Sequence, residues 1–149
     1  MRATKGRDTR PELAVRRAVH SLGLRYRVSV RPLAGVRRTA DMVFPRDRVA
    51  AFVDGCFWHG CPAHLRPART NGAFWAGKIA ATRERAADTD RRLGVGGWSV
   101  VRAWEHDDTA EVAARVLVAV LAARARRGQA ASVGPRRGTA NSVVCPAAG

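Results

Sequence analysis

The chain has 149 residues, of which 27 are Lys or Arg and 12 are Asp or Glu, and its formal net charge at pH 7 is +15. Hydrophobic residues make up 46% of the chain, which is typical of one globular domain and excludes a chain that is disordered throughout. No apolar run is long enough to cross a membrane, and no apolar segment resembles a secretory signal, so we expect a cytoplasmic protein. Such a positive charge predicts a polyanionic partner, of which nucleic acid is the commonest.

The N-terminal region begins with a basic arm at residues 1–10 and continues with a predicted helix over residues 9–22. Thr9 and Glu12 have the spacing of a capping box, in which the two residues satisfy backbone N–H groups at the start of a helix. Gly23 is a typical residue just beyond the last turn, because glycine adopts the left-handed conformation at little cost.

The middle of the chain predicts three strands in succession. Residues 24–30 alternate in polarity and favour a first strand. Residues 39–45 and 48–55 favour two further strands, joined by a tight connection as an antiparallel hairpin. A loop rich in cysteine and histidine follows the hairpin directly.

The rest of the chain predicts a helix, a strand and a last helix. Residues 71–94 favour the first of these helices, which the glycine pair at 96–97 ends. Residues 98–106 favour a buried strand, and Asp108 is a suitable cap for the last helix.

This order of elements predicts an α/β sandwich in which helices cover both faces of a mixed sheet. We expect residues 1–127 to form this domain and residues 128–149, where Gly, Pro, Ser and Ala dominate, to form a disordered tail. Cys145 lies in that tail and has no assigned role. No helix offers a spare apolar face, so we expect a monomer.

Two carboxylates are predicted to converge on the hairpin. If Phe44 pairs with Val49, Asp41 lies opposite Phe52 and projects from the same face as Asp54. Such a pair suits Mg²⁺, which takes one or two carboxylates and would stabilise charge on a phosphate during phosphodiester cleavage. Alternatively, both acids pair with arginines at the strand ends, and the spacing alone does not choose between these interpretations.

The loop after the hairpin carries ligands typical of zinc. Cys56, Cys61 and His64 lie within nine residues of one another, and Zn²⁺ takes four such ligands in a tetrahedron. The fourth would be His106, at the end of the predicted strand, or His59, which is closer in sequence. A closed site of this kind would be structural. The alternative is a pair of reduced cysteines among surface histidines.

Large aromatic side chains lie next to these ligands. Phe57 and Trp58 are inside the loop, and Trp75 is near the start of the helix that follows it. They could form the hydrophobic cover of a metal site, or they could insert between base pairs and unstack them. Composition does not separate the two roles.

Five segments together resemble the very short patch repair DNA mismatch endonucleases: RDTRPELAVRRAVHSLGLRYR, ADMVFP, VAAFVDGCFWHGCPAH, FWAGKI and GWSVVRAWEH. The resemblance spans residues 7–106, and DGCFWHGC is its most specific part. It implies a restriction-endonuclease-like fold, which is a three-layer sandwich with a mixed central sheet flanked by helices. It also implies a Mg²⁺-dependent enzyme with a structural Zn²⁺ that nicks double-stranded DNA beside the T:G mismatch left by deamination of 5-methylcytosine.

The resemblance further implies roles for individual residues. Asp41 would be catalytic and would bind Mg²⁺ together with the backbone carbonyl of Val53. His59 would assist the attacking water, and Glu12 would belong to the active site. Asp54 stands where some members have a histidine, and as a catalytic residue it could hold a metal-bound water. The implied zinc ligands are Cys56, Cys61, His64 and His106. The implied DNA wedges are Phe57, Trp58 and Trp75.

The sequence departs from the family pattern at one important position. The family pairs its catalytic histidine with an aspartate, and the alignment places Ala86 there. Asp88 is two residues further on and about 200° around a helix, whereas Asp90 is one turn on and lies on the same face. Because His59 would lose its orienting partner, an alternative function is a zinc-stabilised DNA-binding protein of the same fold with weak or lost nuclease activity.

Overall fold

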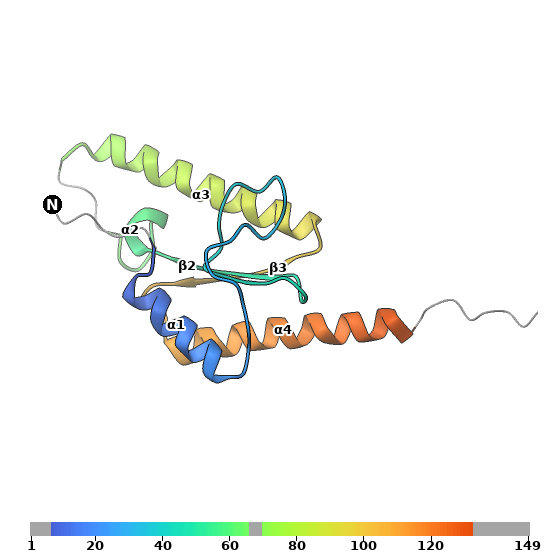
Figure 1. Ribbon diagram of the computed structural model, residues 1–149. Helices are drawn as coiled ribbons and strands as arrows, with labels where there is room; N and C mark the ends of the chain where they lie inside the picture. The colour runs from blue at the N-terminus through green and yellow to red at the C-terminus, as the bar shows by residue number, and fades with distance from the viewer. Residues whose placement is uncertain (1–6, 66–69, 133–149) are drawn as a thin grey trace, which may run out of the picture.

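The structure, a computed structural model, describes residues 7–65 and 70–132 (Figure 1). In chain order its elements are α1 (Arg10–Ser21), β1 (Met42–Phe44), β2 (Val49–Asp54), α2 (Cys56–His59), α3 (Gly72–Val95), β3 (Ser99–Trp104) and α4 (Thr109–Ser132). The strands form one mixed sheet in the order β1-β2-β3, with β1 antiparallel and β3 parallel to β2. Helix α3 covers one face of the sheet and helices α1 and α4 cover the other (Figure 1). The predicted sandwich of three layers is confirmed.

The central strand β2 is buried on both faces. Val49 and Ala51 belong to the apolar cluster shared with α1 and α4, whereas Ala50 and Phe52 belong to the cluster on the α3 side. Neither face of this strand meets water over these residues, and this explains the unbroken apolar run in the sequence.

The predicted hairpin is also confirmed, and its register decides where the carboxylates lie. Phe44 pairs with Val49, so Asp41 lies beside the far end of β2. Strands β2 and β3 end together, because Asp54 pairs with Trp104. One end of the sheet therefore brings together the start of β1, the helix α2 and the residues after β3.

Local signals fix the ends of the helices as expected. The hydroxyl of Thr9 accepts the N–H of Glu12 at 3.5 Å, and the Glu12 carboxylate accepts the N–H of Thr9 at 3.3 Å, so the capping box is present. Gly23 follows α1 with a φ of 81°. Asp108 caps α4 by accepting the N–H of Glu111 at 2.9 Å.

The strand predicted over residues 24–30 is wrong. This segment forms only isolated bridges, from Arg27 to Val43 and from Val30 to Ala40, and the sheet of the described residues has three strands. Ser29 is in the left-handed region with a φ of 51°, which interrupts the extended backbone that a strand requires.

The last helix is longer than the domain boundary at residues 127 and 128 implied. Helix α4 continues through Gly128 to Ser132, because an exposed glycine costs a helix only about 1 kcal/mol and the flanking arginines, glutamine and alanines are good helix formers. The rest of the expected tail, with Cys145, and the first six residues of the basic arm lie outside the described residues. Within the described part of the chain, no helix is both long and apolar enough to cross a bilayer.

Candidate active site and metal centre

A cavity of about 400 Å³ opens at the end of the sheet where β2 finishes. Its walls come from the start of α1, the segment before β1, the end of β2, helix α2 and the residue after β3. Its ionisable lining residues are Glu12, Arg38, Asp41, Asp54, His59 and Glu105. The structure therefore brings together all four side chains expected in the active site, namely Glu12, Asp41, Asp54 and His59.

Asp41 is a largely buried carboxylate of this cavity, and it lacks a cationic partner in the described ranges. Its side chain accepts the N–H of Val53 at 2.7 Å, and it forms no ion pair with any residue of the described ranges. Burial raises the pKa of Asp41 to about 6, the Val53 hydrogen bond opposes the rise, and the nearby charge of Glu12 adds to it. A bound cation is what would favour the ionised form of such a group.

Glu12 serves both the helix and the cavity. Its carboxylate closes the capping box of α1 and also accepts the N–H of Asp8 at 2.8 Å and a contact from Arg16 at 3.5 Å. The side chain is 9% exposed, and these contacts fix its position from several directions.

Asp54 lies between a histidine and an arginine. One carboxylate oxygen is 3.3 Å from Nε2 of His59. Arg102 on β3 donates to both oxygens, at 2.8 and 2.9 Å, and through the rest of its guanidinium it donates to Asp90 at 2.8 to 3.1 Å. The side chains form a continuous chain from His59 through Asp54 and Arg102 to Asp90. The arginine pairing considered from the sequence is therefore present for Asp54 and absent for Asp41.

Although Ala86 stands where the family has an aspartate, another carboxylate contacts His59. Ala86 is buried, and its carbonyl accepts a contact from Arg102 at 3.4 Å. Asp88 contacts Arg91 and Arg92 instead, at 2.7 Å each. Asp90, on the same face of α3 as Ala86, reaches Arg102 but does not contact His59. The carboxylate that contacts the His59 ring is Asp54.

Burial keeps His59 in its neutral form, which is the form that can accept a proton. The residue is 9% exposed, and this burial lowers its pKa, while the charge of Asp54 raises it and those of Arg38 and Arg102 lower it. A neutral imidazole held by a carboxylate is a typical general base.

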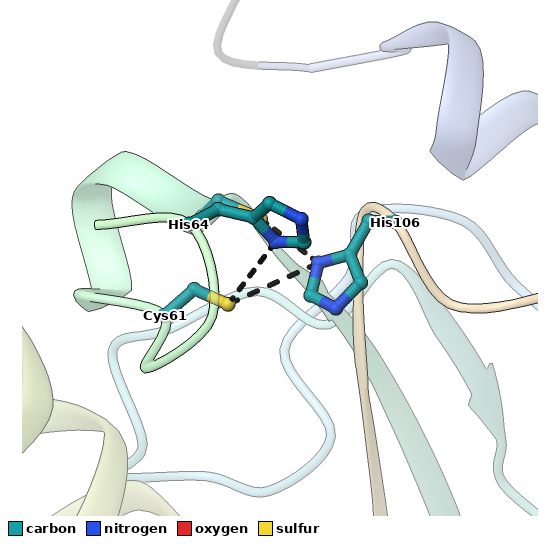
Figure 2. Close-up of side chains that lie close together, drawn as sticks. Cys61, His64 and His106 are labelled. Carbon is teal, nitrogen blue, oxygen red and sulfur yellow. Dashed lines mark hydrogen bonds between the residues drawn. The ribbon is translucent and has the colours of Figure 1, made fainter. Parts of the chain in front are cut away.

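Four sulfur and nitrogen ligands gather beside the cavity. The ligand atoms of Cys56, Cys61, His64 and His106 all lie within 4.8 Å of one another. Figure 2 shows Cys61, His64 and His106 pointing toward one another from the loop after α2 and from the end of β3. The separations of sulfur from Nδ1 run from 3.0 to 3.9 Å. A tetrahedron with metal–ligand bonds of about 2.0–2.3 Å has edges of this size.

The geometry also separates the two histidines that competed for the fourth position. His106 contributes its Nδ1 to the cluster, whereas His59 turns toward Asp54. The other nitrogen of His106 lies 3.6 Å from a carboxylate oxygen of Asp107, a contact that orients a histidine ligand. Burial and the neighbouring Cys61 and Glu105 raise the pKa of Cys56 to about 12, so a bound metal would have to displace the thiol proton.

Helix α2 is held against its neighbours at both ends. The N-cap Gly55 has no side chain to offer, and Glu105 accepts the N–H of Cys56 at 2.6 Å instead. At the other end Arg83 of α3 donates to the carbonyl of His59 at 2.9 Å and to that of Gly60. Gly60 has a φ of 61°, and a Cβ there would lie 2.7 Å from Ile79.

These contacts bring the aromatic side chains into one exposed patch. Phe57 lies 5.3 Å from both Trp58 and Trp75, measured between ring centroids, and the two tryptophans are 6.0 Å apart. Phe74, which the sequence did not single out, adds a fourth ring 5.4 Å from Trp75. Trp58 is 48% exposed and Phe74 57%. A patch that is this open is a surface for contact rather than a closed core.

Sequence reasoning missed several residues of the site. Arg102 was detectable, because a charged residue in the middle of the apolar run VVRAW is unusual for a buried strand. Glu105 directly precedes the metal-site residue His106, but its bond to Cys56 depends on the parallel pairing of β2 and β3. Arg38 and Arg83 gave no local signal, since individual arginines do not stand out in a sequence so rich in arginine.

Comparison with known proteins identifies relatives over most of the chain. The family model described as DNA mismatch endonuclease Vsr matches residues 1–64. The Type II nicking enzyme V.NaeI of Lentzea aerocolonigenes is 40% identical over 119 residues, which cover 78% of this chain and 72% of that enzyme. The Type II nicking enzyme V.XorIIP of Xanthomonas oryzae pv. oryzae is 39% identical over 70% of this chain and 76% of its own length. The Type II nicking enzyme V.NmeDIP of Neisseria meningitidis serogroup C is 40% identical over 72% of each chain.

Proposed function

Because the chain belongs to the Vsr family of DNA mismatch endonucleases and is a strand-nicking DNA endonuclease, we propose that it cuts one strand of duplex DNA beside a T:G mismatch. The family has a restriction-endonuclease-like fold, to which the mixed sheet with helices on both faces belongs. The observation that carries the proposal is the cavity at the end of β2, where Asp41, Glu12, His59 and Asp54 lie together beside an exposed aromatic patch.

We assign Mg²⁺ to Asp41 and the backbone carbonyl of Val53. The support is chemical, since Asp41 is a largely buried carboxylate whose pKa burial raises to about 6 and which has no cationic partner in the described ranges. When bound there, Mg²⁺ stabilises charge on the phosphate that is cut. Glu12 adds a second negative charge close to Asp41, which favours a divalent cation over a monovalent one.

The proposed base is His59. Its ring accepts the proton of the attacking water in the neutral form that burial favours. Asp54 orients the ring through the contact of 3.3 Å to Nε2 and stabilises the imidazolium that forms, the role that a third carboxylate has in hydrolytic triads. Ala86 therefore does not leave His59 without a carboxylate, and this observation favours a cutting enzyme over a protein of the same fold that only binds DNA.

We propose that the cluster of Cys56, Cys61, His64 and His106 binds a structural Zn²⁺. The ligand types and their separations suit a closed tetrahedral site. All four positions are filled by side chains, which leaves none for a substrate. The site would join α2 and the loop after it to the end of β3, and it would thereby hold His59 and the aromatic patch in place.

The aromatic patch supplies the proposed mismatch selectivity. Phe57, Trp58 and Trp75 would insert beside the mismatch and replace base stacking with contacts to aromatic rings. A T:G step is already weakened, so unstacking costs less there than at a Watson–Crick step. The protein would act as a monomer that holds the duplex through the patch and through its basic surface.

The proposal is tested with labelled duplexes that differ only in one base pair. The wild-type protein is incubated with Mg²⁺ and a duplex that carries one T:G mismatch, with the T:A duplex as the reference. We expect a nick on the thymine strand of the first duplex and little cutting of the second, and no nick with Mg²⁺ omitted. Equal cutting of both duplexes would refute the mismatch specificity, and unchanged cutting without a divalent metal would refute the metal assignment.

A further inference from the structure

A second cavity, of about 530 Å³, adjoins the active-site cavity. It lies between the segment at residues 35–39, just before β1, and the second half of α3. Arg38 and Thr39 line both cavities, so the two are neighbours. Nothing in the proposed mechanism uses this second space.

The charge of the second cavity is strongly one-sided. Its ionisable lining residues are Arg37, Arg38, Arg85, Arg92 and Asp88. The acid is already engaged, because Asp88 pairs with Arg91 and Arg92 at 2.7 Å each. Among the described residues, Arg85 donates only to the hydroxyl of Thr82, at 3.1 Å. Three arginines thus face the space without a carboxylate of their own.

Arg38 differs from the other arginines of this cavity in its environment. It is half-buried, and in the described ranges neither Arg38 nor Arg37 has a hydrogen-bond or ion-pair partner. Burial lowers the pKa of Arg38, and the charge of Arg102 lowers it further, while Asp54 and Asp41 raise it. A half-buried guanidinium with no acceptor is unfavourable in the free protein, and an anion entering the cavity would remove this cost.

We propose that this arginine-lined cavity binds a DNA backbone phosphate on the cut strand, next to the phosphate that enters the active site. The inference rests on the proposed function, because the active-site cavity must hold the cut phosphate for its neighbour to lie here. Arginine is well suited to the task, since its planar guanidinium donates two parallel hydrogen bonds to phosphate oxygens. Arg38, which lines both cavities, fixes the position of the strand relative to Asp41.

The site is separable from the aromatic patch. Arg85 is ten residues beyond Trp75 on the same helix, which is about 15 Å along its axis. Replacing Arg85 therefore removes charge from the cavity at a distance from the Trp75 ring. Arg17 provides a matched control, because it is an exposed arginine on α1, across the sheet from α3 (Figure 1).

The test uses binding in the absence of Mg²⁺, so that cutting plays no part. Affinity is measured for a T:G duplex and for a set of duplexes in which each phosphate around the cut site is replaced, one at a time, by an uncharged methylphosphonate. For the wild type we expect the position next to the cut phosphate to be among the sensitive ones. Arg38→Ala should bind the unmodified duplex about tenfold more weakly, since it loses hydrogen bonds to a charged phosphate.

The decisive result is the loss of that one sensitivity. In Arg38→Ala the methylphosphonate at the neighbouring position should have little further effect, whereas substitutions elsewhere should weaken binding as in the wild type. Arg85→Ala should behave in the same direction. The slope of log affinity against log salt should fall by about 0.9 for each phosphate contact removed. Arg38→Lys keeps the charge and should restore part of the affinity.

Two outcomes would overturn the proposal. One is that Arg38→Ala and Arg85→Ala bind like Arg17→Ala, with an unchanged salt slope. The other is that they bind more weakly but remain sensitive to every phosphate position. A failure of the proposed function would appear separately, as equal affinity and equal nicking of T:G and T:A duplexes by the wild-type protein.

Discussion

Replacing Asp54 with Asn tests the chain of side chains that links His59 to Asp90. The substitution keeps the size of the side chain and removes its charge. It weakens the contact of 3.3 Å to His59 and the two contacts of 2.8 and 2.9 Å to Arg102. Because the general base typically contributes about 10²- to 10⁴-fold to the rate and an unoriented histidine loses most of this contribution, we expect nicking to fall by about that factor.

The effect on stability should be moderate. Arg102 retains its hydrogen bonds to Asp90, at 2.8 to 3.1 Å, so Asp54→Asn does not leave a buried guanidinium without an acceptor. We expect a loss of about 1.5–3 kcal/mol in the free energy of unfolding, the usual range for a hydrogen bond to a charged group. Affinity for the mismatched duplex should change little, since Asp54 lines the cavity at the end of β2 and is not part of the aromatic patch.

The assay is single-turnover nicking of the T:G duplex with Mg²⁺, accompanied by a melting curve and a binding measurement on each variant. Asp47→Asn is the matched control. Asp47 is also a buried carboxylate paired with two arginines, Arg124 at 3.3 Å and Arg127 at 3.1 Å, but it lies in the hairpin turn at the opposite end of the strands. It should lose stability and keep its nicking rate. If Asp54→Asn nicks at the wild-type rate, Asp54 does not orient the base and the assignment fails.

Asp41→Asn should abolish nicking while DNA binding persists, because the substitution removes the proposed Mg²⁺ ligand from a strand end rather than from the core; a variant that still nicks at the normal rate would contradict the site. Purified protein should contain one Zn²⁺ per chain, and both chelation and Cys61→Ala should lower the melting temperature as well as activity, since the metal joins two segments of the fold; a well-folded protein without zinc on elemental analysis would contradict the ligand set. Trp58→Ala should weaken binding to the T:G duplex by about tenfold or more, with little change for the T:A duplex and a small melting shift, since the side chain is 48% exposed; equal losses on both duplexes with a large melting shift would mean that Trp58 only covers the metal site.

Most of the fold could be predicted from the sequence because its signals are local. Capping residues such as Thr9 and Asp108, the period of the apolar positions, and the hairpin register set by Phe44 and Val49 act over a few residues. The prediction of a strand at residues 24–30 was wrong for an equally local reason. One left-handed residue, Ser29, ends the extended run, and alternation of polarity does not reveal a single backbone angle.

The site was only partly predictable, since its decisive contacts cross the fold. That Asp54 contacts His59 could not be read from the spacing, which indicated only that Asp54 and Asp41 share a face. The partner of Asp54 comes from β3, 48 positions later in the chain. Likewise, the exposed condition of Trp58 depends on how α2 packs against α3. Residue types and spacing predicted which residues would meet, but not which of them would pair.

The position of β3 at the edge of the sheet has a consequence for self-association. Within the described residues no strand pairs with its outer side, and an open strand edge can add strands from other molecules and start aggregation. Arginines of α4 reach over this edge: Arg115 donates to the backbone carbonyl of Arg102, and Arg126 donates to the hydroxyl of Ser99 at 3.1 Å. Their charges repel the same edge on a second copy. Part of the positive charge therefore hinders the addition of strands from other molecules. Neutralising Arg115 and Arg126 should make the protein aggregate at concentrations where the wild type stays dispersed.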